Sequence, residues 1–145
     1  SVIVEATNFP LRLKMILEKT KFNLSEPVKM VFFAENIGNE TLDMSMYEDD
    51  FNFIVCDEAG SEVYDWNKNH GHIALYIPTP LPPGLSKTYT LEWKQDYNLK
   101  LITLDPHSQF EYKKASPGRY EIIGQFISSH LGFTIETSPV TITIS

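Results

Sequence analysis

Two histidines, His70 and His72, have the spacing in this sequence that is best suited to chemistry. They are separated by one residue, so on an extended chain both imidazoles can point to the same side and bind a metal ion. A zinc site needs a third ligand and usually a fourth, and no spacing in the sequence supplies them. His70 and His72 are therefore weak metal candidates, and the simpler interpretation is a polar loop.

A cluster of carboxylates, Glu48, Asp49 and Asp50, offers the oxygen ligands that Ca²⁺ prefers, although it lacks the D-x-D-x-D-G spacing. The cluster lies in residues 30–67, an interval with acidic but no basic residues. This interval is either a solvated face that keeps the protein soluble or a surface that steers a basic partner. The net charge of −7 argues against nucleic acid as a partner.

The single cysteine, Cys56, is the remaining candidate for covalent chemistry. A nucleophilic thiol or hydroxyl needs a nearby histidine and an orienting carboxylate, and the sequence contains no G-x-S-x-G, H-E-x-x-H, P-loop or G-x-G-x-x-G motif. Cys56 follows an alternating apolar stretch, which indicates a structural thiol. We expect no disulfide, no cofactor and no enzymatic activity.

The elements that would position these residues are strands, because apolar and polar residues alternate along most of the chain. In residues 11–17, for example, Leu11, Leu13, Met15 and Leu17 occupy every second position. Similar stretches predict about eight strands and no helix. They are residues 11–17, 28–34, 42–46, 51–55, 63–66, 89–93, 120–126 and 133–144.

These strands predict an all-β fold, specifically an antiparallel two-sheet sandwich of the immunoglobulin type, with a barrel as the alternative. The 145 residues suit a single domain. No stretch of about 18 apolar residues exists, so we expect no membrane insertion. Edge strands can pair between chains, which leaves a monomer or a weak dimer open.

Two segments are candidates for binding a partner. Residues 78–84 contain four prolines, which fix φ and remove amide donors, so this segment should be stiff and extended, neither helix nor central strand. Its candidate contact residues are Pro80, Leu81 and Pro82. Residues 94–116 lack a clear period and predict a long loop or insertion, with Leu99 and Leu101 as candidate contacts.

Six aromatic residues fall between residues 64 and 97: Tyr64, Trp66, Tyr76, Tyr89, Trp93 and Tyr97. Alternation sends Tyr64 and Trp66 to one face of their strand, which is either core or an exposed patch for protein binding. We expect core for Trp93 and for one of these two residues.

The order of several short motifs resembles the intracellular proteinase inhibitor family, typified by the Bacillus inhibitor of its own subtilisin-like proteases. The similarity extends over residues 21–128. Its motifs are Phe51-Asn52-Phe53-Ile54-Val55-Cys56-Asp57, Glu62-Val63-Tyr64-Asp65-Trp66, Leu81 to Gly84, Leu91-Glu92-Trp93-Lys94 and Pro117-Gly118-Arg119-Tyr120. Pro-Gly-x-Tyr before a strand also occurs in many immunoglobulin-like domains, where the Tyr ring can tie a corner.

The resemblance implies an antiparallel sandwich without disulfides, a serine protease as partner and a cytoplasmic location. It carries no reactive-site residue onto this chain. Residues 94–116 are longer than the corresponding stretch of the family, which leaves inhibition open to question. The alternative is a cell-surface or accessory immunoglobulin-like binding domain without inhibitory activity, so the compartment stays open.

Overall fold

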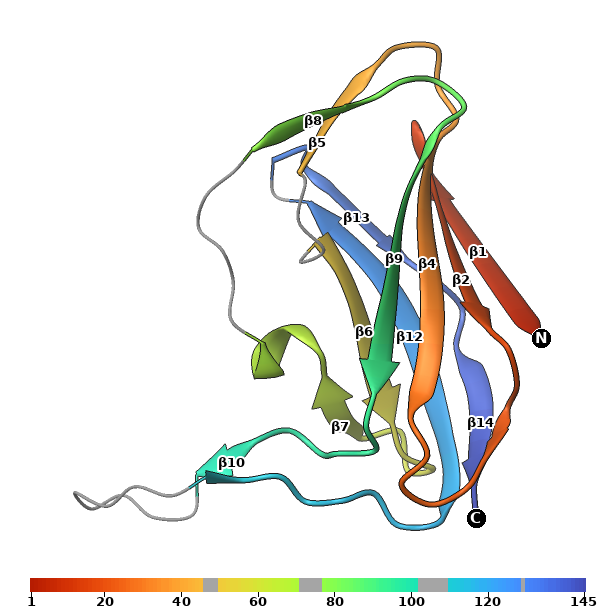
Figure 1. Ribbon diagram of the computed structural model, residues 1–145, viewed down its shortest axis with the longest axis vertical. Coiled ribbons are helices and arrows are strands. Elements are labelled where there is room, and N and C mark those ends of the chain that lie inside the picture. Colours follow the sequence, from red (N-terminus) through yellow and green to blue (C-terminus); the bar gives the residue numbers. More distant parts are fainter. Residues whose placement is uncertain (46–49, 71–76, 102–109, 129) are drawn as a thin grey trace.

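Strands dominate the chain in the computed structural model, which describes residues 1–45, 50–70, 77–101, 110–128 and 130–145 (Figure 1). The described residues contain no α-helix and one short 3₁₀ helix, η2 (Asn67–Asn69). The prediction of an all-β fold is therefore confirmed. Among the described residues, no helix has the length and apolar character that a membrane crossing requires.

The first of two large sheets has four strands in the order β1-β2-β4-β9. All neighbouring pairs are antiparallel. Burial alternates strictly along β2 and β4, as their sequences predict, because one face of the sheet meets the core and the other meets solvent. The strands are β1 (Val2–Asn8), β2 (Leu11–Leu17), β4 (Val28–Asn36) and β9 (Ser86–Trp93).

The second large sheet has the order β3-β14-β12-β6-β7, and β13 also pairs with β12. The long strand β12 is the centre of this sheet, because β6 runs antiparallel along one side while β14 and β13 share the other. The strands are β3 (Lys21–Phe22), β6 (Phe51–Cys56), β7 (Glu62–Asp65), β12 (Gly118–Ser128), β13 (Phe133–Glu136) and β14 (Val140–Ile144).

Two small antiparallel ribbons lie at opposite ends of these sheets (Figure 1). One pairs β5 (Leu42–Ser45) with β8 (Pro78–Leu81), and the other pairs β10 (Lys100–Leu101) with β11 (Phe110–Glu111). Both ribbons leave the faces of the large sheets free to pack on each other.

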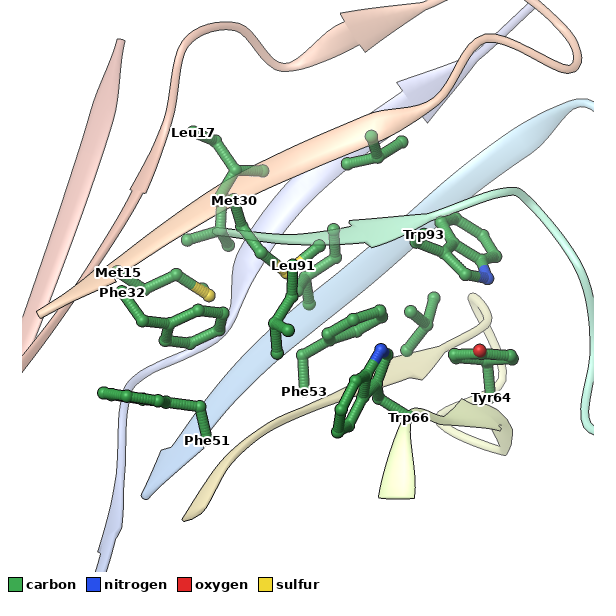
Figure 2. Packing of buried hydrophobic residues seen from close by; sticks show 14 of the residues in the cluster. Met15, Leu17, Met30, Phe32, Phe51, Phe53, Tyr64, Trp66, Leu91 and Trp93 are labelled. Carbon is green, nitrogen blue, oxygen red and sulfur yellow. The ribbon is translucent and has the colours of Figure 1, made fainter. Parts of the chain in front are cut away.

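The core forms where the two large sheets face each other (Figure 2). The Phe32 ring of β4 lies 5.7 Å from the Phe51 ring of β6, and the Trp93 ring of β9 lies 5.5 Å from the Tyr120 ring of β12, centroid to centroid. Tyr64 and Trp66 are both buried, and Tyr64 stacks on Phe53. The core interpretation of these aromatic residues is therefore confirmed, and the packing makes the fold sandwich-like.

The structure differs from the expected strands in number and direction. The described residues contain fourteen strands rather than about eight. Strands β3, β10 and β11 have only two residues and show no period, β1 and β8 lie outside the expected ranges, and residues 133–144 contain two strands, β13 and β14. The sheets are antiparallel as expected, except that the two-residue β3 runs parallel to β14. The chain crosses between the large sheets after β2, so it reaches the edge of the second sheet in the direction of β14.

A tyrosine fixes the approach to β12. The Tyr120 hydroxyl donates a hydrogen bond to the Ser116 carbonyl oxygen at 2.7 Å, and the Tyr97 hydroxyl lies 3.5 Å from the same Tyr120 oxygen. The hydrogen bond between the Tyr97 and Tyr120 hydroxyls, followed by burial, raises the pKa of Tyr97 to about 12. Burial raises the pKa of Tyr64 to about 12 as well.

The raised pKa values of Tyr64 and Tyr97 predict a loss of stability at alkaline pH. The native protein holds both phenolic protons up to about pH 12, whereas the unfolded chain releases them near the usual value of 10.0. The native state therefore binds more protons in this window, and the free energy of unfolding falls as pH rises from 10 to 12. Urea unfolding at several pH values measures the slope, and Tyr64→Phe should reduce it. An unchanged slope in Tyr64→Phe would contradict the assignment.

A second prediction concerns the close approach of the sheets at Gly124. A Cβ at this position would lie 2.9 Å from Met15 Sδ and 2.9 Å from Phe32 Cε1. Gly124→Ala should lower the free energy of unfolding by about 1–3 kcal/mol, since a filled core must shift to accept it. Urea unfolding measures this effect, with Glu121→Ala at an exposed position of the same strand as control. Equal stabilities of the two variants would refute the close packing.

Candidate partner-binding loops

Residues 78–84, which we call the proline segment, begin as β8 and end in a turn. Among the described strands, β8 pairs with β5 alone, with Asp43 opposite Pro80 and Leu42 opposite Leu81. Prolines are tolerated in such a ribbon because neither strand is central in a sheet. The turn closes through a hydrogen bond from Leu85 N to Pro82 O at 3.2 Å, and Gly84 takes the positive φ of 81° that the turn requires.

The three candidate contacts of the proline segment differ in exposure. Pro80 and Pro82 are exposed, whereas Leu81 is only 7% exposed and belongs to the core cluster. Residues 78–80 of β8 are all exposed, so burial begins at Leu81, where the segment meets the core cluster. This burial argues against Leu81 as a contact side chain and gives it the role of an anchor.

Asn36, at the end of β4, ties the proline segment to the first sheet. Its side chain is fully buried, and Nδ2 donates to Leu81 O at 2.9 Å and to Glu40 O at 2.7 Å. Its Oδ1 accepts a hydrogen bond from Gly38 N at 3.0 Å.

The Asn36 backbone also bonds the end of the segment, because its carbonyl accepts from Gly84 N at 2.8 Å and its amide donates to Leu85 O at 3.0 Å. One residue thus fixes both ends of the turn. From the sequence, Asn36 can be recognised only as a residue that favours turns, because its partner Leu81 is 45 residues away.

The described parts of the second candidate segment, residues 94–101 and 110–116, form an arm at the opposite end (Figure 1). Its base is closed by hydrogen bonds from Tyr97 N to Lys113 O and from Ala115 N to Gln95 O, both at 2.6 Å. Short strands β10 and β11 therefore occur where the sequence shows no period. Residues 102–109 and the Leu101 side chain lie outside the described part, while Leu99 is 42% exposed.

Asn98 joins the arm to the edge strand β7. Asn98 N donates to Val63 O at 2.8 Å, and its Oδ1 accepts from Asp65 N at 2.9 Å. Asn69 then links back to the arm by accepting from Leu99 N at 2.8 Å. These contacts satisfy backbone groups that β7 would otherwise offer to another chain.

A hollow of about 600 Å³ lies between the arm and β7. Its lining contains acidic and basic side chains together with polar, aromatic and aliphatic ones. The lining residues are Glu62, Val63, Tyr97, Asn98, Lys100, Glu111, Tyr112 and Lys113. This mixed lining has no feature that selects one class of ligand.

The metal candidates do not assemble in the described residues. The His70 ring stacks on Trp66 with 4.1 Å between centroids, and its Nδ1 lies 2.7 Å from Trp66 O. His72, Glu48 and Asp49 lie outside the described residues. No group of three or more His, Cys, Asp or Glu side chains suited to a metal ion occurs in the part of the chain that the structure describes.

The acidic interval is partly neutralised by basic residues from other segments. Glu35 pairs with Arg12 at 3.2 Å, Asp50 with Lys87 at 3.9 Å and Glu62 with Lys68 at 2.6 Å. Cys56 lies half-buried beside the acidic residues of this interval, and burial, followed by the charges of Glu62, Glu121 and Asp57, raises its pKa. A raised pKa disfavours the reactive thiolate, which agrees with a structural thiol.

These features define a sandwich-like all-β protein whose ordered segments project at its two ends. The chain belongs to the BsuPI family, intracellular proteinase inhibitor, which it matches over residues 15–130. The resemblance found in the sequence is therefore confirmed. An inhibitor family agrees with a non-enzymatic protein and implies a protease as partner. No curated protein matches the chain.

Among solved structures, the chain is similar to parts of a β-glucosidase from Listeria innocua. The complex with glucose gives a TM-score of 0.52 at 14% identity, covering 93% of this chain and 16% of the enzyme. The complex with isofagomine gives 0.52 at 14% identity, covering 92% and 16%. The chain thus spans about a sixth of these enzymes, and the likeness shows the fold alone.

The role of Asn36 generates a third prediction. Asn36→Ala removes three side-chain hydrogen bonds and leaves the carbonyl of the buried Leu81 without this partner, so we expect a loss of about 2–4 kcal/mol in the free energy of unfolding. Hydrogen exchange at the Gly38 amide should become faster, while exchange at the Ala115 amide, which bonds to Gln95 at the base of the arm, should keep its rate. Asn39→Ala, at the exposed position nearby, is the control. Similar stability and exchange in both variants would refute the role of Asn36.

Proposed function

We propose that this protein inhibits a serine protease of the subtilisin type and that the proline segment makes the inhibitory contact. Membership of the proteinase inhibitor family supports a protease as the partner. The observation that carries the choice of segment is the set of hydrogen bonds by which Asn36 holds residues 81–85 while Pro80 and Pro82 remain exposed.

The physical argument is preorganisation. Ordering one backbone residue costs about 1–2 kcal/mol, so a segment that is already fixed loses less entropy on binding. Prolines fix φ in the free protein, and Asn36 fixes the ends of the turn. The segment is already ordered in β8 and in the turn that follows it, so it can enter a protease cleft with little loss of conformational freedom.

The arm, through Leu99 and Leu101, is the rival contact of the same inhibitor. Leu99 is exposed at the opposite end of the molecule, and its backbone is fixed through Asn69. We favour the proline segment because its four prolines are all exposed and the turn at its end is held by hydrogen bonds to Asn36.

We also propose that residues 1–145 form one domain of immunoglobulin-like topology. The strand order β14-β12-β6-β7 facing β2-β4-β9 supports this assignment. The Tyr120 hydroxyl bound to Ser116 O gives the corner expected at the start of such a strand.

A second candidate function is an accessory binding domain without inhibitory activity. It is favoured by the occurrence of the same fold as about a sixth of the β-glucosidase chains. This function would use the same exposed segments on a different partner.

The fourth prediction tests inhibition. Purified protein added to subtilisin-type serine proteases should inhibit at least one of them stoichiometrically. Pro82→Arg should raise the inhibition constant about tenfold or more, because a bulky charge enters the contact, while Leu99→Arg should change it little. Active-site titration with a chromogenic peptide substrate measures both.

Three other outcomes are informative. A selective effect of Leu99→Arg would transfer the contact to the arm. Cleavage of the protein without inhibition would contradict the inhibitor function. Binding to a non-protease partner with no inhibition would favour the accessory domain.

A further inference from the structure

We propose that Phe9 and Leu85 extend the proline segment into one apolar binding tip, and that its partner is a protein surface with an apolar groove and a basic side chain at the rim. We define the tip as residues 8–10, 36–40 and 80–85. This inference rests on the proposed function, because it takes the protease as the partner.

The tip exposes large apolar side chains that a turn does not need. Phe9 is 69% exposed, the highest value among the large apolar side chains of the described residues, and Leu85 is 55% exposed. Burying such a side chain stabilises a protein or a complex by about 1.5–3 kcal/mol. Contiguous exposed apolar residues mark interaction sites, and aromatic residues often dominate binding energy.

Backbone hydrogen bonds attach Leu85 and Pro10, the neighbour of Phe9, to consecutive residues at the end of β4 and directly after it. Asn36 N donates to Leu85 O at 3.0 Å, and Ile37 N donates to Pro10 O at 2.8 Å. The turn between β1 and β2 and the end of the proline segment are therefore fixed to the same two residues.

Gly38 allows the turn to pack closely. A Cβ at Gly38 would lie 2.9 Å from Pro10 Cβ and 3.6 Å from Phe9 Cζ. The Phe9 ring therefore lies against the turn that Asn36 organises, and the three segments form one surface. In Figure 1 these segments meet at the end of the molecule opposite the arm.

The charge of the tip indicates the chemistry of the partner. Among residues 8–10, 36–40 and 80–85, the sequence has one charged residue, Glu40, and its side chain is exposed. The nearest cation along β2, Arg12, pairs with Glu35. An apolar surface with one carboxylate fits an apolar groove with a basic side chain at its rim.

The experiment is a titration of subtilisin-type serine proteases with Phe9→Ser and Leu85→Ser, after thermal unfolding has shown that each variant is folded. We expect each substitution to raise the inhibition constant about tenfold or more. The controls are Ile3→Ser and Leu24→Ser, which change apolar side chains that are 54% and 50% exposed outside the tip. Their inhibition constants should stay within about threefold of the wild-type value, as expected for residues outside a contact.

The same titration tests the charge of the partner. Glu40→Lys should weaken inhibition, and more so at low salt, because it places a cation opposite a cation. Glu121→Lys makes the same charge change at an exposed position of β12, outside the tip, and should change the inhibition constant little. An unchanged or lower inhibition constant for Glu40→Lys would refute the proposal that the partner has a basic side chain at the rim of its groove.

The outcomes separate this inference from the proposed function. If the wild-type protein inhibits and the Phe9 and Leu85 variants inhibit equally well, the apolar tip is refuted and the inhibitor function stands. If the wild-type protein inhibits none of the proteases, the proposed function fails, and the inference fails with it.

Discussion

Burial of alternating apolar side chains between two facing sheets is the constraint on which the rest of this structure depends. Every second residue of β2 and β4 points into the core, where Phe32 meets Phe51 and Trp93 meets Tyr120. Once these faces are occupied, chain segments that leave the sheets must project at the ends. The ends then need their own order, which comes from hydrogen bonds of asparagine side chains and, in the proline segment, from the buried anchor Leu81.

Asn36 and Asn98 show how that order arises. Each accepts and donates hydrogen bonds to backbone groups of a distant segment, so each fixes a loop without a disulfide or metal ion. The Asn36 amide is fully buried, so its donors and acceptor must be satisfied, which makes the position of the proline segment specific. The two segments with candidate contacts are therefore extensions of the fold. This is the property that a family of proteinase inhibitors would need in a contact surface.

The sequence predicted the parts of the fold in which a periodic pattern is long. Strands β2, β4, β6, β9, β12 and β14 follow from alternation, and the resemblance to the inhibitor family is confirmed. The two-residue strands β3, β10 and β11 could not be predicted, because they are too short to show a period. The burial of Leu81 and the role of Asn36 depend on contacts between distant residues, which no local pattern encodes. The exposed Phe9 has no periodic signal either, since it lies in a turn.

A crystal structure of the protein bound to an inhibited subtilisin-type protease is the most direct test of whether the preordered proline segment makes the inhibitory contact. We expect the protease to contact Phe9, Pro82 and Leu85, and we expect the hydrogen bonds of Asn36 to be the same as in the free protein. A complex in which the protease contacts only the arm, or in which residues 80–85 rearrange on binding, would contradict it.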